Sequence, residues 1–580
     1  MATIQAKICR GHKYWYIVES QRINGKPRPI VLAYLGKPED LLKRLQGISE
    51  AGKLKSYSHG AVGALLEVAR RLDIAEIINK YVKSPRSYRP PKPIRNHLTA
   101  GMTIVLAAIG RACMPTSKRE WASWAQTTSL GYILRRNLSK LDSQHFWDMM
   151  DTVPIEAIEQ IEQQLLEKVF DLYELDSDTL FFDTTNFFTF IDSTNQRCTI
   201  ARRGKNKQKR NDLRQVSLAM VVTRKDMIPL FHISYEGNLH DAKISGDVIG
   251  KVKKRLVDLS LDMKKHTLVF DRGVNSKENL ALIKELSMHY VGALTPSHHK
   301  QLVTDAADNF QQILVNDVPI QVFRDKRTIW NEQRTVVVFI SENLKAGQLR
   351  GIYQSLEKKT AELQKLHQSL SRSKAKRQDK TKLQARIKQI IKGQFTANLI
   401  KWSLGQESEK EFVLRFSVDQ KKLDELEDQL GFRILMTDRH DWDTVEIIKA
   451  YYGQSQIEHT FKNLKNPYHL ALRPQFHWTD QKIIVHNFIC VLSYLLSVIL
   501  FRQAKTKIAF SGSIDTLLDE LNNIRLAAVL EQSDKPGPAK AGYQLEQMSE
   551  SQNRLMRAFG IEKFHLLRPI LNGVSVYSHR

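Results

Sequence analysis

Residues 451–465 read YYGQSQIEHTFKNLK, and this spacing predicts a helix with one polar, charged face. Side chains three and four residues apart share a helical face, and on this face they are Tyr451, Gln454, Glu458, Lys462 and Lys465. A carboxylate flanked by a phenol, an amide and two ammonium groups suits a metal ion bound to a phosphodiester. The acid would hold the cation and its neighbours would hold phosphate oxygens. The alternative is a surface helix with an ordinary Glu458–Lys462 ion pair.

The charge balance of the chain predicts a polyanionic partner. Its 580 residues include 88 Lys and Arg against 62 Asp and Glu, which gives a formal net charge of +26. Such an excess favours nucleic acid over a membrane surface. One apolar run, 483–501, approaches membrane-spanning length, but it contains His486 and Asn487 and we expect a buried core helix.

The cysteines argue for a reducing compartment. Cys9, Cys113, Cys198 and Cys490 are far apart and form no CxxC pair, which argues against a zinc knuckle and a disulfide framework. The first residues carry no apolar signal core. We therefore expect a cytoplasmic protein with no membrane partner.

Short apolar runs predict a mixed α/β sheet. They lie at 180–186, 215–223, 229–235 and 266–271, and a helical pattern at 241–259 precedes the last of them. Three successive strands followed by a helix and a strand predict a sheet that begins with a meander.

A chain of this length is expected to form several domains. Asn24-Gly25 predicts a hairpin in the first module. Leucines at a/d spacing from Leu356 to Leu370 predict a short helical hairpin or coiled coil in the first half of the basic segment 356–392, within the insertion. The expected divisions are an N-terminal β module at 1–50, a helical DNA-binding domain at 51–170, an α/β domain in two parts at 171–295 and 431–505, a β-rich insertion at 296–430, and a C-terminal helical region at 506–580.

Two aspartates have matching settings. Asp183 follows Thr179-Leu-Phe-Phe, Asp271 follows Thr267-Leu-Val-Phe, and we expect both at the carboxyl ends of strands, where α/β sheets build ligand sites. A single such Asp is usually a turn or cap residue. Together with Glu458, however, they offer oxygen donors without His or Cys, which favours Mg²⁺ or Mn²⁺ over zinc. Two such ions, about 3.5–4 Å apart, can drive an in-line phosphoryl displacement.

The chain resembles the DDE transposases of bacterial insertion sequences. The resemblance rests on the order Asp183, Asp271, Glu458, on Phe270-Asp-Arg-Gly, and on the helix Tyr451-x2-Gln454-x3-Glu458-x6-Lys465. It is similar to the group with a Tyr-x2-Arg-x3-Glu-x6-Lys signature, and the phrase Gly237-Asn-x-x-Asp241 also matches a subgroup. The resemblance implies an RNase H-like catalytic domain interrupted by a β-rich insertion. It further implies cut-and-paste transposition through hairpin intermediates, by a synaptic homodimer that binds terminal inverted repeats and target DNA near the bacterial nucleoid.

The same resemblance implies roles for single residues. Asp183, Asp271 and Glu458 would be catalytic and would ligate two Mg²⁺ or Mn²⁺ ions. The expected DNA contacts are Tyr451, Gln454, Lys462, Lys465, Arg272, Arg202, Arg203 and Lys205. The cluster from Arg202 to Lys205 could instead be a solvated hairpin tip. Gln454 replaces the family's arginine, which removes a charge and the guanidinium fork. Trp402 and Trp442 are candidates for base stacking, with a core or rim position as the alternative.

Two other functions fit the same residues. One is a catalytically inactive, sequence-specific DNA-binding protein on a transposase scaffold, which would not nick DNA. The other is a different RNase H-like nuclease, such as a junction resolvase, which would cut branched DNA without needing specific ends.

Overall fold

The computed structural model describes most of the chain. The described residues are 2–9, 12–23, 26–39, 42, 53–93, 95, 98–192, 194–206, 210–239, 241–370, 379–408, 411–467, 470–472, 476–531, 540–562 and 564.

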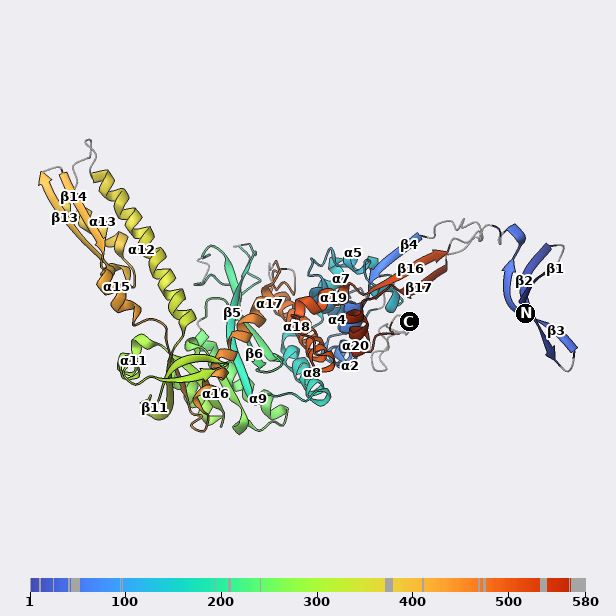
Figure 1. Ribbon diagram of the computed structural model, residues 1–580, viewed down its shortest axis with the longest axis horizontal. Coiled ribbons are helices and arrows are strands. Elements are labelled where there is room, and N and C mark those ends of the chain that lie inside the picture. The colour runs from blue at the N-terminus through green and yellow to red at the C-terminus, as the bar shows by residue number, and fades with distance from the viewer. Residues whose placement is uncertain are drawn as a thin grey trace.

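A nine-stranded mixed sheet lies at the centre of the fold, in the order β10-β11-β12-β15-β9-β8-β5-β6-β7 (Figure 1). Its first five strands along the chain are β5 (Thr179–Thr189), β6 (Arg214–Thr223), β7 (Pro229–Glu236), β8 (Thr267–Phe270) and β9 (His289–Leu294). Strands β5, β6 and β7 pair antiparallel in succession, while β8 runs parallel to both β5 and β9. The helix α9 (Asp241–Asp258) connects β7 to β8. The predicted mixed α/β class and the opening meander are confirmed.

The interval 296–430 is divided between two structures rather than forming one insertion. Strands β10 (Gln311–Val315), β11 (Val318–Ile329) and β12 (Glu332–Ile340) extend the central sheet, because β12 pairs with β15 (Phe432–Thr437). Backbone pairing across this edge makes them part of the α/β core.

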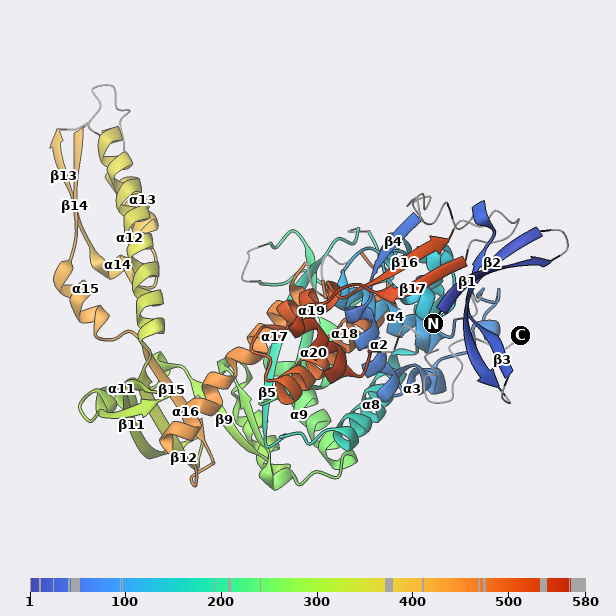
Figure 2. The ribbon, with the colours of Figure 1, turned by 45° about the vertical axis from the view of Figure 1, so that its right-hand side comes forward.

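The rest of the interval forms an arm that projects from the sheet in both views (Figures 1 and 2). It contains α12 (Glu342–Leu370), α13 (Lys380–Ile391), α14 (Thr396–Leu399), the hairpin β13 (Ile400–Ser408)–β14 (Glu411–Val418) and α15 (Gln420–Glu427). The arm has its own hydrophobic cluster, to which Leu356, Leu363, Leu366 and Leu370 belong. All four leucines lie on the single helix α12, and the same cluster contains Leu383 and Ile387 of α13, so the predicted pairing of helices forms between α12 and α13.

A helical layer beside the sheet surrounds one long helix. Helices α2 (Gly60–Arg71), α4 (Ala100–Cys113) and α7 (Ser143–Asp151) pack on α18 (Asp480–Ile508), and α3 (Ile74–Tyr81) and α8 (Ile158–Leu172) complete the layer. In the described part of the chain, α18 is the one helix long and apolar enough to cross a membrane, yet 94% of its apolar window is buried inside the protein. The prediction of a buried core helix is confirmed.

The two ends of the chain are richer in strands than the sequence predicts. At the N-terminus β1 (Ala2–Cys9), β2 (His12–Ile23) and β3 (Lys26–Gly36) form a sheet, with Ile23 opposite Lys26; Asn24 and Gly25 lie outside the described residues.

The prediction of a wholly helical C-terminal region is wrong. Between α19 (Ile514–Asn522) and α20 (Glu550–Phe559) lie β16 (Arg525–Glu531) and β17 (Lys540–Leu545). Strand β16 also pairs with β4 (Lys53–Ser58) from the far end of the chain. This distant strand satisfies the backbone of β16, and local sequence patterns do not reveal it.

Residues 451–465 form the end of one helix and the whole of another, rather than one continuous helix. Helix α16 (Thr444–Gly453) ends before Gln454 and α17 (Ser455–Lys465) begins after it. Hydrogen bonds from Gln454 N to Tyr451 O (3.0 Å) and from Ile457 N to Gln454 O (3.1 Å) span three residues, so the backbone tightens at the junction.

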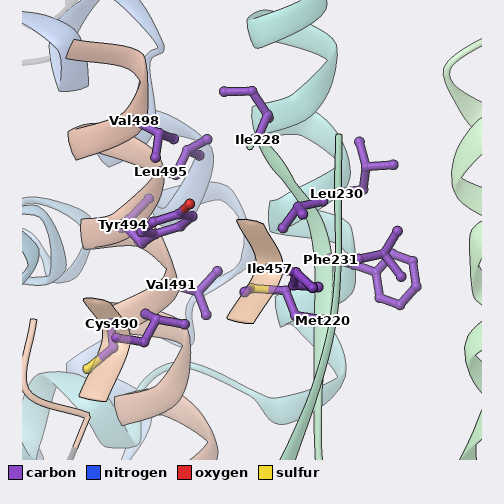
Figure 3. Close-up of a cluster of buried hydrophobic side chains, with 14 of the residues drawn as sticks. Met220, Ile228, Leu230, Phe231, Ile457, Cys490, Val491, Tyr494, Leu495 and Val498 are labelled. Carbon is purple, nitrogen blue, oxygen red and sulfur yellow. The ribbon is translucent and has the colours of Figure 1, made fainter. Parts of the chain in front are cut away.

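Helix α17 lies between the sheet and α18. Figure 3 shows Ile457 of α17 beside Met220 of β6, with Val491 and Tyr494 of α18 on its other side. All four side chains are buried, and Thr460 of α17 is hydrogen-bonded to the Tyr494 hydroxyl at 2.8 Å. This packing fixes the helix over the face of β5 and β6.

We predict that Gly453→Ala destabilises the fold by about 1–3 kcal/mol. A Cβ at Gly453 would lie 2.4 Å from Cζ of the buried Phe181 on β5, so the ring and helix would have to separate. Gly246→Ala in α9 is the control, because its Cβ would meet nothing within 4 Å and alanine favours a helix by about 1 kcal/mol. Urea denaturation of both variants measures the difference; equal midpoints would contradict this packing.

Candidate active site

The two aspartates lie at the same level of the sheet. The parallel register of β5 and β8 pairs Phe181 with Val269, and two residues further along each chain come Asp183 and Asp271. Neighbouring strands lie about 4.8 Å apart, so the two residues are side by side. Asp271 follows the last residue of β8, as predicted.

The predicted position of Asp183 at the end of a strand is wrong, because β5 continues to Thr189. Asp183 is instead the point where the buried first part of β5 becomes half-exposed. The antiparallel partner β6 runs alongside all of β5 and supports the extra length. The carboxylate therefore lies at the edge of the core, and its Oδ1 accepts a hydrogen bond from Thr184 N at 2.7 Å.

Tyr451 connects α16 to the second aspartate. Its hydroxyl donates to Asp271 Oδ1 at 3.4 Å and accepts from Arg433 of β15 at 3.1 Å. The Arg433 guanidinium also lies 5.6 Å from the centroid of the Tyr451 ring. Burial raises the pKa of Tyr451 to about 12, and the negative charge of Asp271 adds to this shift. The phenol therefore remains a proton donor to Asp271 at neutral pH.

Helix α17 runs along β5 on the face that carries Asp183. Gly453, next to its start, touches the Phe181 ring, and Lys465 at its end donates a hydrogen bond to the Thr185 hydroxyl. Phe181, Asp183 and Thr185 alternate along one strand and therefore share one face of the sheet. The contacts at Phe181 and Thr185, the residues on either side of Asp183 on this face, thus place α17 above Asp183.

Glu458 and Lys462 are exposed on α17, and Lys465 is half-buried. Glu458 lies seven residues before Lys465, so the two side chains leave the helix in nearly the same direction. Glu458 is therefore on the helical face that reaches β5 through Lys465.

Gln454 does not share this exposed face. It is 8% exposed at the α16–α17 junction, because the tightened turn directs it inward. This placement differs from the prediction, in which Gln454 lies beside Glu458 and contacts phosphate.

The residues fit a hard divalent cation through the aspartate pair. Mg²⁺ commonly takes one or two protein carboxylates and keeps water or phosphate in its other positions. In the described ranges, no group of three or more His, Cys, Asp and Glu side chains is placed to hold a metal ion. Joint ligation by Asp183, Asp271 and Glu458 therefore stays a prediction.

Exposed cations lie beside Asp271 and, farther along the sheet, on the segment that follows β5. Arg272 is half exposed, with its Nε 3.9 Å from Asp271 Oδ1. Arg202, Arg203 and Lys205 are exposed on the segment that follows β5, and the backbone of Arg202 bonds to Gln215 of β6 in both directions.

A close backbone approach holds this basic segment in place. The Gln215 amide donates to Gly237 O at 2.6 Å and to Lys205 O at 3.3 Å. A Cβ at Gly237 would lie 2.0 Å from Gln215 O, so this position needs glycine.

Sequence reasoning missed Arg433 and Thr185, which contact Tyr451 and Lys465. Arg433 is the one charged residue of β15, and that isolated charge in an apolar strand was the available signal.

The two tryptophans proposed for stacking lie elsewhere: Trp402 packs half-buried on the core of the arm, and Trp442 packs on the main core with Arg439 5.2 Å from its ring centroid.

Comparisons with known proteins give similarities to solved structures only. No family model matches the sequence, and no curated protein matches it. Among solved structures, the piggyBac transposase synaptic complex with hairpin DNA is similar with a TM-score of 0.37 and 8% sequence identity, over 79% of this chain and 79% of that chain.

We predict that Tyr451→Phe lowers the free energy of unfolding by about 0.5–1.5 kcal/mol at pH 8, because the Asp271 and Arg433 bonds are lost. The pKa of Tyr451 is raised from 10.0 to about 12 in the fold, so its stabilisation is present below pH 10 and is lost as pH rises toward 12. Between pH 8 and 11 the advantage of the wild type should fall by about 1 kcal/mol. Urea titrations at both pH values measure it; a constant difference would contradict the assigned contacts.

Proposed function

We propose that the chain is a metal-dependent DNA transposase of the DDE class, of the bacterial insertion-sequence group. The observation that carries the proposal is the pair Asp183 and Asp271, side by side on the sheet beneath the helix that bears Glu458. The antiparallel meander followed by parallel strands supports an RNase H-like form for this domain. The net charge of +26 supports DNA as the partner.

In this proposal the carboxylates place the cation and their neighbours place the DNA. Asp183 and Asp271 would hold Mg²⁺ or Mn²⁺, and Glu458 would complete a two-ion site. When bound, such ions activate a water or a 3′-hydroxyl and stabilise the leaving oxygen. Tyr451 donates to one oxygen of Asp271 and so fixes the orientation of that carboxylate.

The surrounding cations would hold phosphate groups. Lys462 and Arg272 are exposed, and Lys465 reaches the same face of β5 as Asp183. Ammonium and guanidinium donors form strong charge-assisted bonds with phosphate oxygens. Two or more such contacts would fix the scissile phosphate relative to the carboxylates.

The reaction that follows is cut-and-paste transposition. Water would attack a phosphodiester at the end of the element and release a 3′-hydroxyl, which would attack the opposite strand and form a hairpin. A second hydrolysis would reopen the hairpin, and the end would join target DNA. We propose that a homodimer holds both inverted repeats during these steps, at the nucleoid of a bacterial cytoplasm.

One observation favours a second candidate, a catalytically inactive DNA-binding protein. The described residues do not bring three acids into one ligand cluster. Such a protein would bind its DNA but would show no metal-dependent nicking.

We predict that Asp183→Asn lowers the rate of Mg²⁺-dependent nicking by at least about 100-fold and leaves DNA binding intact. The amide is a poorer cation ligand of the same size, and EDTA should abolish nicking by the wild type. Nicking of a supercoiled plasmid that carries the inverted repeats measures the rate. Cleavage by Asp183→Asn at the wild-type rate would contradict the site.

The matched control is Asp178→Asn, an exposed residue just before the amino end of β5. It should nick like the wild type. A wild type that binds but never nicks would support the inactive binder, and cutting of branched DNA without inverted repeats would support a resolvase.

We predict that Arg202→Ala, Arg203→Ala and Lys205→Ala together reduce the salt dependence of DNA binding. Three lost phosphate contacts should lower the slope of log K against log salt by about 2 to 3. The control substitutes alanine for three other exposed lysines, Lys253 in α9 and Lys264 and Lys265 before the amino end of β8. Fluorescence anisotropy with duplex DNA at several salt concentrations measures both; equal slopes would show that the basic segment does not touch DNA.

A further inference from the structure

Three exposed aromatic rings lie where β5 ends and α18 begins. Phe190 is 51% exposed directly after β5, and Phe476 and Trp478 are 59% and 67% exposed just before α18. The rings of Phe190 and Phe476 are stacked, with centroids 5.3 Å apart and planes at 28°. We call these three residues the aromatic surface.

The backbone before α18 turns two of these rings outward. His477, between Phe476 and Trp478, is 6% exposed and packs inward against the rings of Trp147 (5.1 Å) and His486 (4.5 Å). Alternate residues of an extended segment point in opposite directions. The buried histidine therefore anchors the segment and directs its neighbours to solvent.

Hydrogen bonds hold the segment after β5 against the start of α18. The Asn195 amide donates to Trp478 O at 3.2 Å. Asp480 Oδ1 accepts from Thr199 N at 2.7 Å and from Ile200 N at 3.1 Å. The aromatic surface is thus supported by two segments far apart in sequence, and this part of their backbone does not have to be ordered when a ligand binds.

Positive charge lies on the same segment. Arg197 is exposed between Asn195 and Thr199, and the basic residues from Arg202 to Lys205 follow it. Exposed rings beside cations are the features with which proteins bind single-stranded nucleic acid, because bases stack on the rings and the cations follow the backbone. An apolar protein partner would offer no negative charge to these cations.

We propose that the aromatic surface stacks unpaired bases of single-stranded DNA. Phe190 lies seven residues beyond Asp183, about 23 Å along β5, so these bases are several nucleotides away from the phosphate at the carboxylates. The inference rests on the proposed function for its DNA substrate. It adds that this substrate has an unpaired strand that leaves the carboxylates toward the outer end of the β5–β6 hairpin.

The test measures binding of a fluorescein-labelled thymidine 12-mer to the full chain carrying Asp183→Asn, which should not cut it. Phe476→Ala with Trp478→Ala should weaken binding about 10- to 100-fold, since stacking of one or two bases is lost. An abasic 12-mer with the same phosphates should bind equally to both proteins. The matched control, Trp330→Ala with Tyr353→Ala, removes rings that are 36% and 50% exposed elsewhere and should bind like the parent.

Phe476→Leu keeps the bulk of the side chain and guards against a folding defect; it should weaken thymidine binding and leave thermal stability unchanged. Equal affinity of the parent and the double variant for the thymidine 12-mer would overturn the proposal and leave a protein-binding surface in its place. If the double variant lost the same amount of affinity for the thymidine oligomer and for the abasic oligomer, the proposal would also be overturned. Because cleavage is absent from this assay, a failure of nicking by the wild type tests the proposed function separately.

Discussion

The site depends on the packing of α17 against the face of β5 and β6. Ile457 fills the space between Met220 and α18, Gly453 lets the helix approach Phe181, and Lys465 bonds to Thr185 at the other end. Large apolar contacts of this kind are stiff, because protein interiors are close-packed. Glu458, in the first turn of α17, is therefore on a helix that is held over the strand that carries Asp183. The role that we propose for the exposed Glu458 depends on this packing.

The carboxylates lie where the core ends, so they are not enclosed by apolar side chains. Phe182 and Phe270, the residues immediately before Asp183 and Asp271, are fully buried, whereas Asp271 is half exposed and Asp183 half-buried. A carboxylate one residue deeper would need a partner to offset its desolvation. The buried Tyr451, itself held by the half-buried Arg433, approaches Asp271 from the protein side, and the Asp271 side chain remains half exposed to solvent. This combination of a fixed inner side and an open outer side suits a group that binds a cation from water.

The long β5–β6 hairpin joins the carboxylates to the basic segment and the aromatic surface. Its register runs from Leu180 opposite Thr223 to Thr189 opposite Arg214, so both features extend outward along one rigid ladder. Exposed Phe and Trp side chains do not stabilise an isolated protein through burial, and clusters of them usually mark a binding surface. In the function that we propose, the carboxylates, the cations and the aromatic rings would form one path for a nucleic acid strand.

The sequence by itself determined the mixed α/β class, the meander and the buried α18, because hydrophobic periodicity is a local property. It also placed Asp271 correctly, since β8 ends where its apolar run ends. It could not show that β5 continues past Asp183, that β10–β12 extend the sheet, or that β16 pairs with β4, because each depends on a strand that is distant in the chain. The burial of Gln454, the Arg433–Tyr451–Asp271 contacts and the pairing of Phe190 with Phe476 were likewise decided only by tertiary structure, where packing chooses among directions that the local pattern allows.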